Sequence, residues 1–398
     1  MLKRHPVLQR APFYLTCGAA VSILFSIAVS QILIGLAFAA LLLSGERMRF
    51  PPIKLPLGLY MLGTLISLLL SPNPALGTPQ IRKFFVFLIL LLIYSTYRTL
   101  EQVRWTILLW GAVAALSALR SLFQFLSKYR QAASLHQNFY QYYVGSRITG
   151  FTSHWMTFGG EEMVVLMMLA AFVFLSPRKQ WKIAAWVCAV ILALSMLLGL
   201  TRGIWLGTFV AGMYLFWIWR KWLALGVPIL LVLLVLVSPR AVRERVMSAF
   251  HPHGDTDSNE FRIVVWRAGF GMVKAHPWFG IGPEEVKPQI EKYIPADVPR
   301  PLPSGWYGHL HNIYLQYAAS RGIPDALMFL WLLAKIGYDF IRAVRRKPNP
   351  DARFVLHGAI AVWLGILVVG FFEVNLGDSE VLTMFLSVVG CGYIAAES

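Results

Sequence analysis

Three arginines are the first candidates for a chemical role in this sequence. Arg202 lies between two apolar segments, Arg262 lies near the start of a segment with helical spacing, and Arg147 ends a stretch without an acidic residue. A guanidinium group presents paired N–H donors that match phosphate oxygens, so arginines gathered at a membrane surface predict a lipid-linked phosphate or diphosphate as ligand. Any one of them could instead reach for lipid headgroups or form a structural ion pair. That alternative is weakest for Arg202, because a charge enclosed by apolar helices is expensive.

Two histidines, His309 and His311, precede a later apolar segment. A free imidazole has a pKa of ~6.5, so a histidine at the lip of a cavity can act as a general base near neutral pH. Residues two positions apart do not share a helical face, and we therefore expect at most one of the pair to point into a given site. Asn312 can orient a substrate or cap the helix that follows. A histidine that only anchors a loop by hydrogen bonds is the open alternative.

The sequence gives only weak signals for a metal. Asp255–Thr256–Asp257 has a DxD spacing known from metal-dependent enzymes, but this tripeptide is common by chance and lies among residues that can cap a helix. Glu161–Glu162 stands near the start of an apolar segment. HExxH, GxSxG and phosphate-binding glycine motifs are absent from the sequence. We expect neither a metal nor a cofactor, and the cysteines, which lie in apolar stretches without metal-type spacing, are Cys17, Cys188 and Cys391.

The elements that must position these residues are membrane helices. The chain has 398 residues, of which 57% are hydrophobic and 14% charged, whereas a soluble domain carries about a quarter charged residues. This composition excludes a soluble globular protein and, because apolar residues are abundant, a disordered chain. Several uncharged apolar runs reach the ~17–25 residues that cross a bilayer as a helix, and they do not alternate as barrel strands would.

We predict an all-α polytopic integral membrane protein with about twelve transmembrane helices. Residues 1–237 would hold all but the last three of them, with a shorter outer loop at 127–156. Residues 238–323 would form a large, partly helical outer loop that carries the candidate catalytic motifs, and 324–398 would hold the last helices. The predicted spans are 12–28, 30–43, 55–70, 84–97, 105–126, 158–175, 183–200, 204–219, 223–237, 324–344, 354–372 and 381–395.

The distribution of positive charge predicts the orientation. The chain has 36 Lys and Arg against 19 Asp and Glu, a net charge of +17, which in a soluble protein would suggest nucleic acid. Here the basic residues gather in short connectors on one side, as the positive-inside rule expects for the cytoplasm, and no nucleic-acid partner is predicted. Both termini would then be cytoplasmic, after an uncleaved first helix. Arg82 and Lys83 fall on the outer side, against the rule.

The large outer loop is expected to be folded. Phe261–Ala275 has helical spacing, and residues 257–259 can cap it. Trp266 lies four residues after Arg262 and shares its helical face. Acidic and basic residues are nearly balanced across the loop, so any anion site in it must be formed by individually placed arginines.

The order of these motifs around one large outer loop resembles the O-antigen ligase and O-antigen polymerase superfamily of bacterial envelope glycosyltransferases. The resemblance covers about residues 145–345, and the first third of the chain matches only in the number of spans. The ligase signature is a histidine, then Asn, Ser or Gln, then nine residues, a glycine, two residues and finally Gly, Thr or Tyr; His311, Asn312 and Gly322 fit it. Asp325 departs from the Gly, Thr or Tyr of the last position, so ligase and polymerase both stay open. The matching segments are Arg147–Phe151, Thr201–Gly207, Phe261–Trp266, His276–Pro283 and His309–Asn312.

The resemblance also implies which residues act. His311 matches the family's functional histidine, which would accept a proton from the acceptor. Arg202 and Arg262 match the essential arginines, which would bind the substrate diphosphate, and Arg147 is a third candidate. The candidates for supporting roles are His309, Asn312 and Trp266.

The activity implied by the resemblance is glycosyl transfer at the periplasmic face of the bacterial inner membrane. The donor would be O-antigen linked to undecaprenyl diphosphate, and the acceptor the lipid A–core oligosaccharide, with membrane lipids around both. A GT-C-like fold and inversion at the anomeric carbon, without metal, are implied. A polymerase or a protein O-oligosaccharyltransferase of the same superfamily is an alternative. A transporter of lipid-linked glycan is another, although repeated halves or broken helices would then be expected.

Overall fold

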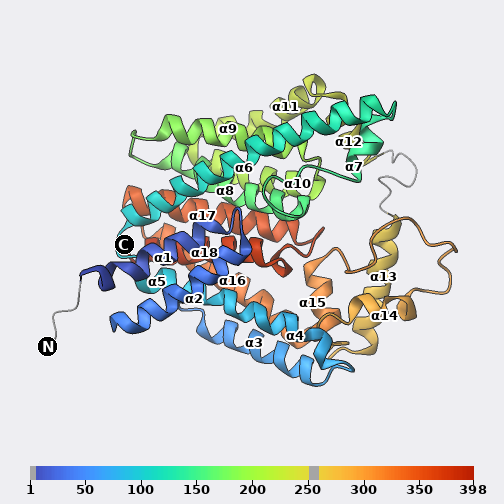
Figure 1. Cartoon of the computed structure of the whole chain (residues 1–398), viewed down its shortest axis with the longest axis horizontal. Coiled ribbons are helices and arrows are strands. Elements are labelled where there is room, and N and C mark those ends of the chain that lie inside the picture. Colours follow the sequence, from blue (N-terminus) through green and yellow to red (C-terminus); the bar gives the residue numbers. More distant parts are fainter. Residues whose placement is uncertain (1–5, 251–259) are drawn as a thin grey trace.

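The structure, a computed structural model, describes residues 6–250 and 260–398, and over these residues it consists of helices without a strand (Figure 1). The long helices run roughly side by side as a bundle. They are α1 (Pro6–Ser22), α2 (Ile27–Ser44), α3 (Lys54–Leu69), α4 (Pro74–Arg82) continued by η1 (Lys83–Phe87) and α5 (Leu88–Thr96), α6 (Leu100–Ser134), α8 (Trp155–Leu175), α9 (Lys182–Leu198), α10 (Arg202–Trp219), α11 (Lys221–Val237), α16 (Ile323–Arg345), α17 (Pro350–Val369) and α18 (Ser379–Glu397).

Each apolar segment predicted to span the membrane lies largely within one of these helices. In the described part of the chain, 6 helical segments are long and apolar enough to cross a membrane. The all-α fold is therefore confirmed over the described residues, and these helices fit a multi-pass membrane protein, whereas the count of about twelve spans and the GT-C-like fold stay predictions. The qualifying segments are Ile27–Ser44, Pro74–Thr96, Leu100–Ser134, Trp155–Leu175, Pro350–Val369 and Ser379–Glu397.

The predicted outer loop at 127–156 starts later than expected, because α6 continues to Ser134. The rest of this loop contains a short helix, α7 (Phe139–Val144). The hydroxyl of Tyr143 donates to the backbone oxygen of Leu198 at 2.7 Å. This contact holds the loop against the end of α9, next to the start of α10.

Small residues allow the central helices to pack closely. The apolar windows of α8, α17 and α18 are 72%, 72% and 78% buried. A Cβ at Gly207 on α10 would lie 2.5 Å from a side-chain atom of Val369 and 2.9 Å from the backbone oxygen of Gly365, both on α17. Glycine permits such an approach between membrane helices. The start of α10, with Arg202, is thereby placed beside the end of α17.

The connectors gather at two opposite ends of the bundle (Figure 1). At one end, where α1 begins and α18 ends, Arg49 pairs with Glu397, and Arg98 pairs with Glu46 at 2.6 Å. At the other end lie the helices of the large loop. The separation of basic connectors from the large loop is what the predicted topology requires. Which end faces the cytoplasm stays a prediction.

In its described residues, 238–250 and 260–323, the large loop contains four helices. They are α12 (Arg240–Met247), α13 (Glu260–Ala275), α14 (Val286–Tyr293) and α15 (Ile313–Arg321). α13 matches the helix predicted over 261–275, whereas Asp255–Thr256–Asp257 and the rest of the expected cap lie outside the described residues. α13, α14 and α15 share a small apolar core that includes Val265 and Met272, both fully buried. The loop therefore has a fixed shape on which side chains can be placed.

Candidate active site

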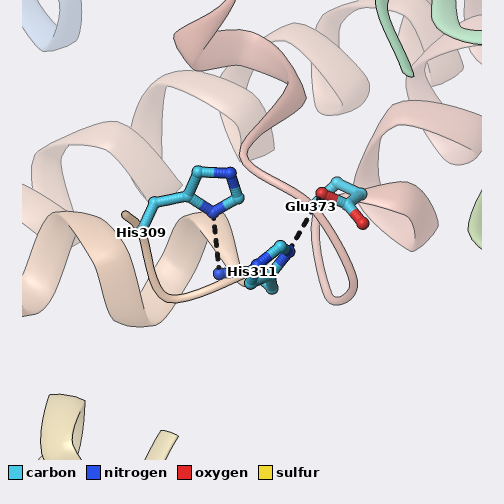
Figure 2. Close-up of side chains that lie close together, drawn as sticks. All are labelled: His309, His311 and Glu373. Atoms are coloured by element: carbon cyan, nitrogen blue, oxygen red, sulfur yellow. Dashed lines mark hydrogen bonds and ion pairs between the residues drawn. The ribbon is translucent and has the colours of Figure 1, made fainter. Parts of the chain in front are cut away.

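Glu373 joins the two kinds of candidate residue, a histidine and an arginine. Its Oε1 accepts a hydrogen bond from Nη2 of Arg262 at 2.9 Å, and its Oε2 lies 3.4 Å from Nδ1 of His311 (Figure 2). Arg262 comes from α13, His311 from the segment before α15, and Glu373 from the segment after α17. The side chains of His311 and Glu373 are only 10% and 11% exposed. An acid, a histidine and an arginine are thus held together largely away from bulk water.

Both histidines lie in this cluster, although we expected at most one of them to point into a given site. That expectation assumed a helix, but His309 and His311 precede α15, and His311 has a left-handed φ of 48°. Their ring centroids are 4.1 Å apart. The backbone N–H of His311 donates to Nδ1 of His309 at 3.2 Å (Figure 2). A neutral His309 ring therefore carries its proton on Nε2 and acts there as a donor.

The ring of His309 is neutral at neutral pH. Burial, followed by the charge of His311, lowers the pKa of His309 to about 4. The Nε2–H of His309 can therefore donate to a substrate. The lone pair on its Nδ1 already accepts the hydrogen bond from the backbone N–H of His311.

Asn312 and Trp266 fix the position of His311. Asn312 caps α15, since its Oδ1 accepts from the backbone N–H of Leu315 at 3.0 Å. Trp266, on α13, donates its Nε1–H to the backbone oxygen of Leu310 at 2.9 Å. Of the two roles considered for Asn312, helix capping is therefore the one seen in the structure. These contacts tie the histidine segment to the start of α15 and to the helix that carries Arg262.

The second ring nitrogen of His311, Nε2, lies 3.0 Å from the backbone oxygen of Trp306. The edge of the Phe261 ring covers the imidazole, with ring centroids 5.2 Å apart. Because a carbonyl oxygen can only accept, Nε2 donates in this contact, and it can act as a proton acceptor only after another group has taken the place of this carbonyl. Adjustments of this kind between free and substrate-bound sites are common for catalytic hydrogen bonds.

Glu373 is the site candidate that the sequence did not reveal. Burial raises the pKa of this carboxyl, but the hydrogen bond from His311 and the positive charge of Arg262 outweigh it and hold the pKa below its usual value. Glu373 is therefore an anion at neutral pH. It directly follows the predicted span at 354–372, where a single acid is an ordinary way for a helix to end. The sequence offered one signal that an acid would lie in the site. Arginines that lie close together need a negative charge nearby when no ligand is bound.

The packing of the residue next to Arg202 places the start of α10 near Glu373. Arg202 is the first residue of α10. A Cβ at Gly203 would lie 3.3 Å from Cβ of Phe372. The start of α10 therefore packs against the residue that precedes Glu373.

Arg147 lies beside the start of α10. Its Nη1 donates to the hydroxyl of Thr201 at 3.4 Å, its Nε donates to the backbone oxygen of Val144 at 3.1 Å, and its guanidinium lies 5.5 Å from the centre of the Trp155 ring. Burial, followed by the charge of Arg245, lowers the pKa of Arg147 to about 9. An anion bound nearby would reverse this shift. The predicted arginines thus gather at one end of the bundle, but only Arg262 bonds to Glu373 directly.

The donor atoms of His309, His311 and Glu373 lie within 4.8 Å of one another, close enough for a metal ion. Two features oppose that use. Nδ1 of His309 already accepts from a backbone N–H, and both oxygens of Glu373 face positively charged or N–H donors. A metal would have to displace these hydrogen bonds. Proton transfer to His311 requires only that the Trp306 carbonyl leave Nε2.

A cavity of about 920 Å³ opens beside the cluster. His309, Glu373, Trp306 and His154 are among its lining residues. Burial lowers the pKa of His154 below its usual value. Among the described residues, neither His311 nor any of the candidate arginines lines this cavity. The cavity therefore reaches the cluster from the side of His309.

These features define a multi-pass helical membrane protein with an acid, histidine and arginine cluster at one end. Residues 187–330 match the family model described as O-antigen ligase, and they include Arg202, Arg262 and His311. This match confirms, for that segment, the resemblance to the O-antigen ligase and polymerase superfamily seen in the sequence. Its members are glycosyltransferase-like ligases and polymerases. A search of curated proteins finds no match to the chain.

Proposed function

We propose that the chain is an inverting, metal-independent glycosyltransferase that ligates O-antigen from undecaprenyl diphosphate onto the lipid A–core oligosaccharide. The reaction would take place at the periplasmic face of the bacterial inner membrane, with both termini cytoplasmic. The observation that carries the proposal is the contact of Glu373 with both His311 and Arg262. Through this contact one carboxylate holds both the proposed proton acceptor, His311, and the proposed phosphate-binding cation, Arg262. A cavity large enough for a saccharide lies beside them.

His311 acts as the general base in this proposal. The acceptor hydroxyl gives its proton to Nε2 of His311 while its oxygen attacks the anomeric carbon. The bond from that carbon to the diphosphate breaks, and undecaprenyl diphosphate leaves with the bonding electrons. Glu373 accepts from Nδ1–H and stabilises the imidazolium, the role that the acid has in Ser-His-Asp sites. Attack opposite the leaving group inverts the configuration, and the imidazolium later returns its proton to solvent.

Arg202, Arg262 and Arg147 hold the diphosphate in this proposal. Their donors stabilise the negative charge that grows on the leaving group. Because Arg262 is paired with Glu373 in the structure, a bound diphosphate would replace one anion by another at this guanidinium. The exchange would free one oxygen of Glu373 to interact with the imidazolium. Holding two lipid-anchored substrates at one membrane depth supplies proximity.

Replacing Arg262 with alanine is expected to lower kcat/KM for the donor by about a hundredfold, because one donor to the developing charge is lost. Arg262→Lys should recover only part of the loss, since an ammonium group cannot form the paired contact. Initial rates at varied donor concentration measure both effects. The matched control is Arg267→Ala, which removes an exposed arginine of the same helix paired with Asp297 at 2.7 Å. Equal activity of the two alanine variants would contradict the role of Arg262.

Removal of divalent metal is expected to leave the transfer rate unchanged, because arginine donors neutralise the leaving group. The test is to treat the purified protein with EDTA, remove the chelate and assay with and without added Mg²⁺ or Zn²⁺. Activity that EDTA abolishes and a metal restores would instead favour a metal at His309, His311 and Glu373, or at Asp255 and Asp257.

Asp325 favours a related activity as the alternative. The ligase signature has Gly, Thr or Tyr at this position, whereas Asp325 is 3% exposed and its Oδ2 accepts from the hydroxyl of Thr64 at 3.2 Å. It packs on Gly63, where a Cβ would collide with the carboxylate. The departure is thus built into the helix packing. A polymerase, or a protein O-oligosaccharyltransferase of the same superfamily, would differ from the ligase in its acceptor.

Reconstitution in lipid vesicles tests the proposal. The protein is supplied with undecaprenyl-diphosphate-linked glycan and, in separate reactions, with lipid A–core, a lipid-linked repeat unit or pilin. Glycosylated lipid A–core with release of undecaprenyl diphosphate is the expected result. Product on the repeat unit or pilin alone would identify the alternative activities. Movement of the intact donor across the bilayer without release would identify a transporter and overturn the proposal.

A further inference from the structure

Lys83 and Arg321 line the cavity that opens beside Glu373, although neither belongs to the cluster around it. Lys83 is one of the two basic residues whose predicted position on the outer side runs against the positive-inside rule. Arg321 is the last residue of α15. The positive-inside rule therefore does not account for the positive charge of Lys83 or of Arg321.

The cavity follows one face of α15. Its lining residues on this helix, at the spacing of one helical face, are Gln316, Tyr317, Ser320 and Arg321. His309 precedes the start of the helix and Arg321 ends it. At 1.5 Å per residue, the helix spans about 13 Å. The cavity thus extends from His309, which lies beside the proposed base, toward Arg321 over more than the length of one sugar ring.

Arg321 is buried, and no acid of the described residues lies within ion-pair distance of it. Its guanidinium donates to the hydroxyl of Tyr60 and to Oε1 of Gln80, the latter at 3.1 Å, and lies 4.0 Å from the centre of the Tyr317 ring. Its Nε has no hydrogen-bond partner. The next acid along the chain, Asp325, is bonded elsewhere. Asp325 acts on this cation through space without bonding to it and offsets part of the cost of burial, and an anionic ligand bonded to the guanidinium would offset more.

Lys83 adds a second positive charge to the same wall. Its Nζ donates to the backbone oxygen of Gly377, again a neutral partner. The acids Glu284, Glu373 and Asp378 also line the cavity. Their side chains bond to Gln80, Arg262 and Thr157, and none of them bonds to Lys83 or Arg321, although Glu284 and Asp378 act on Lys83 through space. Because the arginines assigned to the donor diphosphate do not line this cavity, the two cations are available to a different substrate group.

We propose that Lys83 and Arg321 form an anion-binding subsite for the acceptor, which takes a phosphate or carboxylate group on the acceptor saccharide. The inference rests on the proposed glycosyl transfer and adds the substrate class, an acidic saccharide. Fixing this group near the end of α15 selects which hydroxyl reaches His311. Trp306, which also lines the cavity and is exposed, offers an aromatic face to the sugar rings between these two points, whereas Tyr317 is buried against Tyr60 and Arg321.

The test compares Lys83→Gln and Arg321→Lys with Arg82→Gln in the full-length protein in vesicles. Arg82 is the matched control, because it neighbours Lys83, is exposed and does not line the cavity. Arg321→Lys keeps the buried charge, so that folding is preserved while the paired donors are lost. Each protein is assayed with intact acceptor, phosphatase-treated acceptor and carboxyl-reduced acceptor. Acceptor binding is also followed by tryptophan fluorescence without donor.

Both variants are expected to raise the acceptor KM about tenfold, the value of one charge-assisted hydrogen bond, with an unchanged donor KM. In the wild type, one of the two treatments of the acceptor should raise the KM equally, which identifies phosphate or carboxylate. In the variants that treatment should have no further effect. Variants that keep the wild-type preference for acidic acceptor would overturn the subsite, and so would a rise in donor KM. A wild type that binds acidic acceptor but transfers to none would refute the proposed function alone.

Discussion

Replacing His311 with alanine is expected to reduce glycan transfer by about a thousandfold, because the acceptor hydroxyl loses its general base. Of the two groups bonded to Glu373, only the imidazole can accept a proton, since an arginine stays protonated in proteins. The variant leaves Arg262 paired with Glu373, so the donor should still bind. Single-turnover transfer with donor already bound, measured together with the donor KM, separates these effects.

His309→Ala is the matched control, because the two rings lie side by side, with centroids 4.1 Å apart. Its effect is expected to be about tenfold or less, the value of the hydrogen bond from the His311 backbone that it removes. If His309→Ala abolished transfer and His311→Ala did not, His309 would be the base. The proposed role of Glu373 would then also fail.

The membrane helices could be predicted because apolar composition leaves few structures open in lipid. α2 has 18 residues without a charge, and a helix is the element that satisfies its backbone inside a bilayer. α13 was also predictable, because its 16 residues repeat the helical pattern over several turns. α7 and α14, with 6 and 8 residues, are too short to show a period, and packing against their neighbours determines them.

The candidate residues could be predicted from their types, but their pairing could not. Arg262 and His311 lie 111 and 62 positions from Glu373 in the sequence, so no local pattern reports the contacts. They depend on the folding of the large loop over the end of α17, where the backbone N–H of Ile313 donates to the oxygen of Gly370 at 2.8 Å. The joint use of His309 and His311 depends on a left-handed backbone at a non-glycine residue, a conformation that residue type does not signal.

Glu373→Gln is expected to lower kcat about a hundredfold, with little change in the donor KM. The amide is uncharged and cannot stabilise the imidazolium, and it permits the wrong tautomer of His311. It also releases Arg262 from its ion pair, so the diphosphate should bind at least as well as before. A loss confined to kcat, with a changed pH dependence of kcat, distinguishes a positioning acid from a residue that only stabilises the fold.

Glu373→Asp and Glu291→Gln complete this test. Aspartate keeps the charge on a shorter side chain and should recover part of kcat, whereas a purely structural acid in so tight a site would show no such rescue. Glu291 is an exposed acid paired with Arg300 at 2.6 Å, so its loss should not alter kcat. If Glu373→Gln kept the wild-type kcat and pH dependence, the carboxylate would serve only to neutralise Arg262. The base would then act without an orienting acid, and the link between the diphosphate arginines and the histidine would be structural and not catalytic.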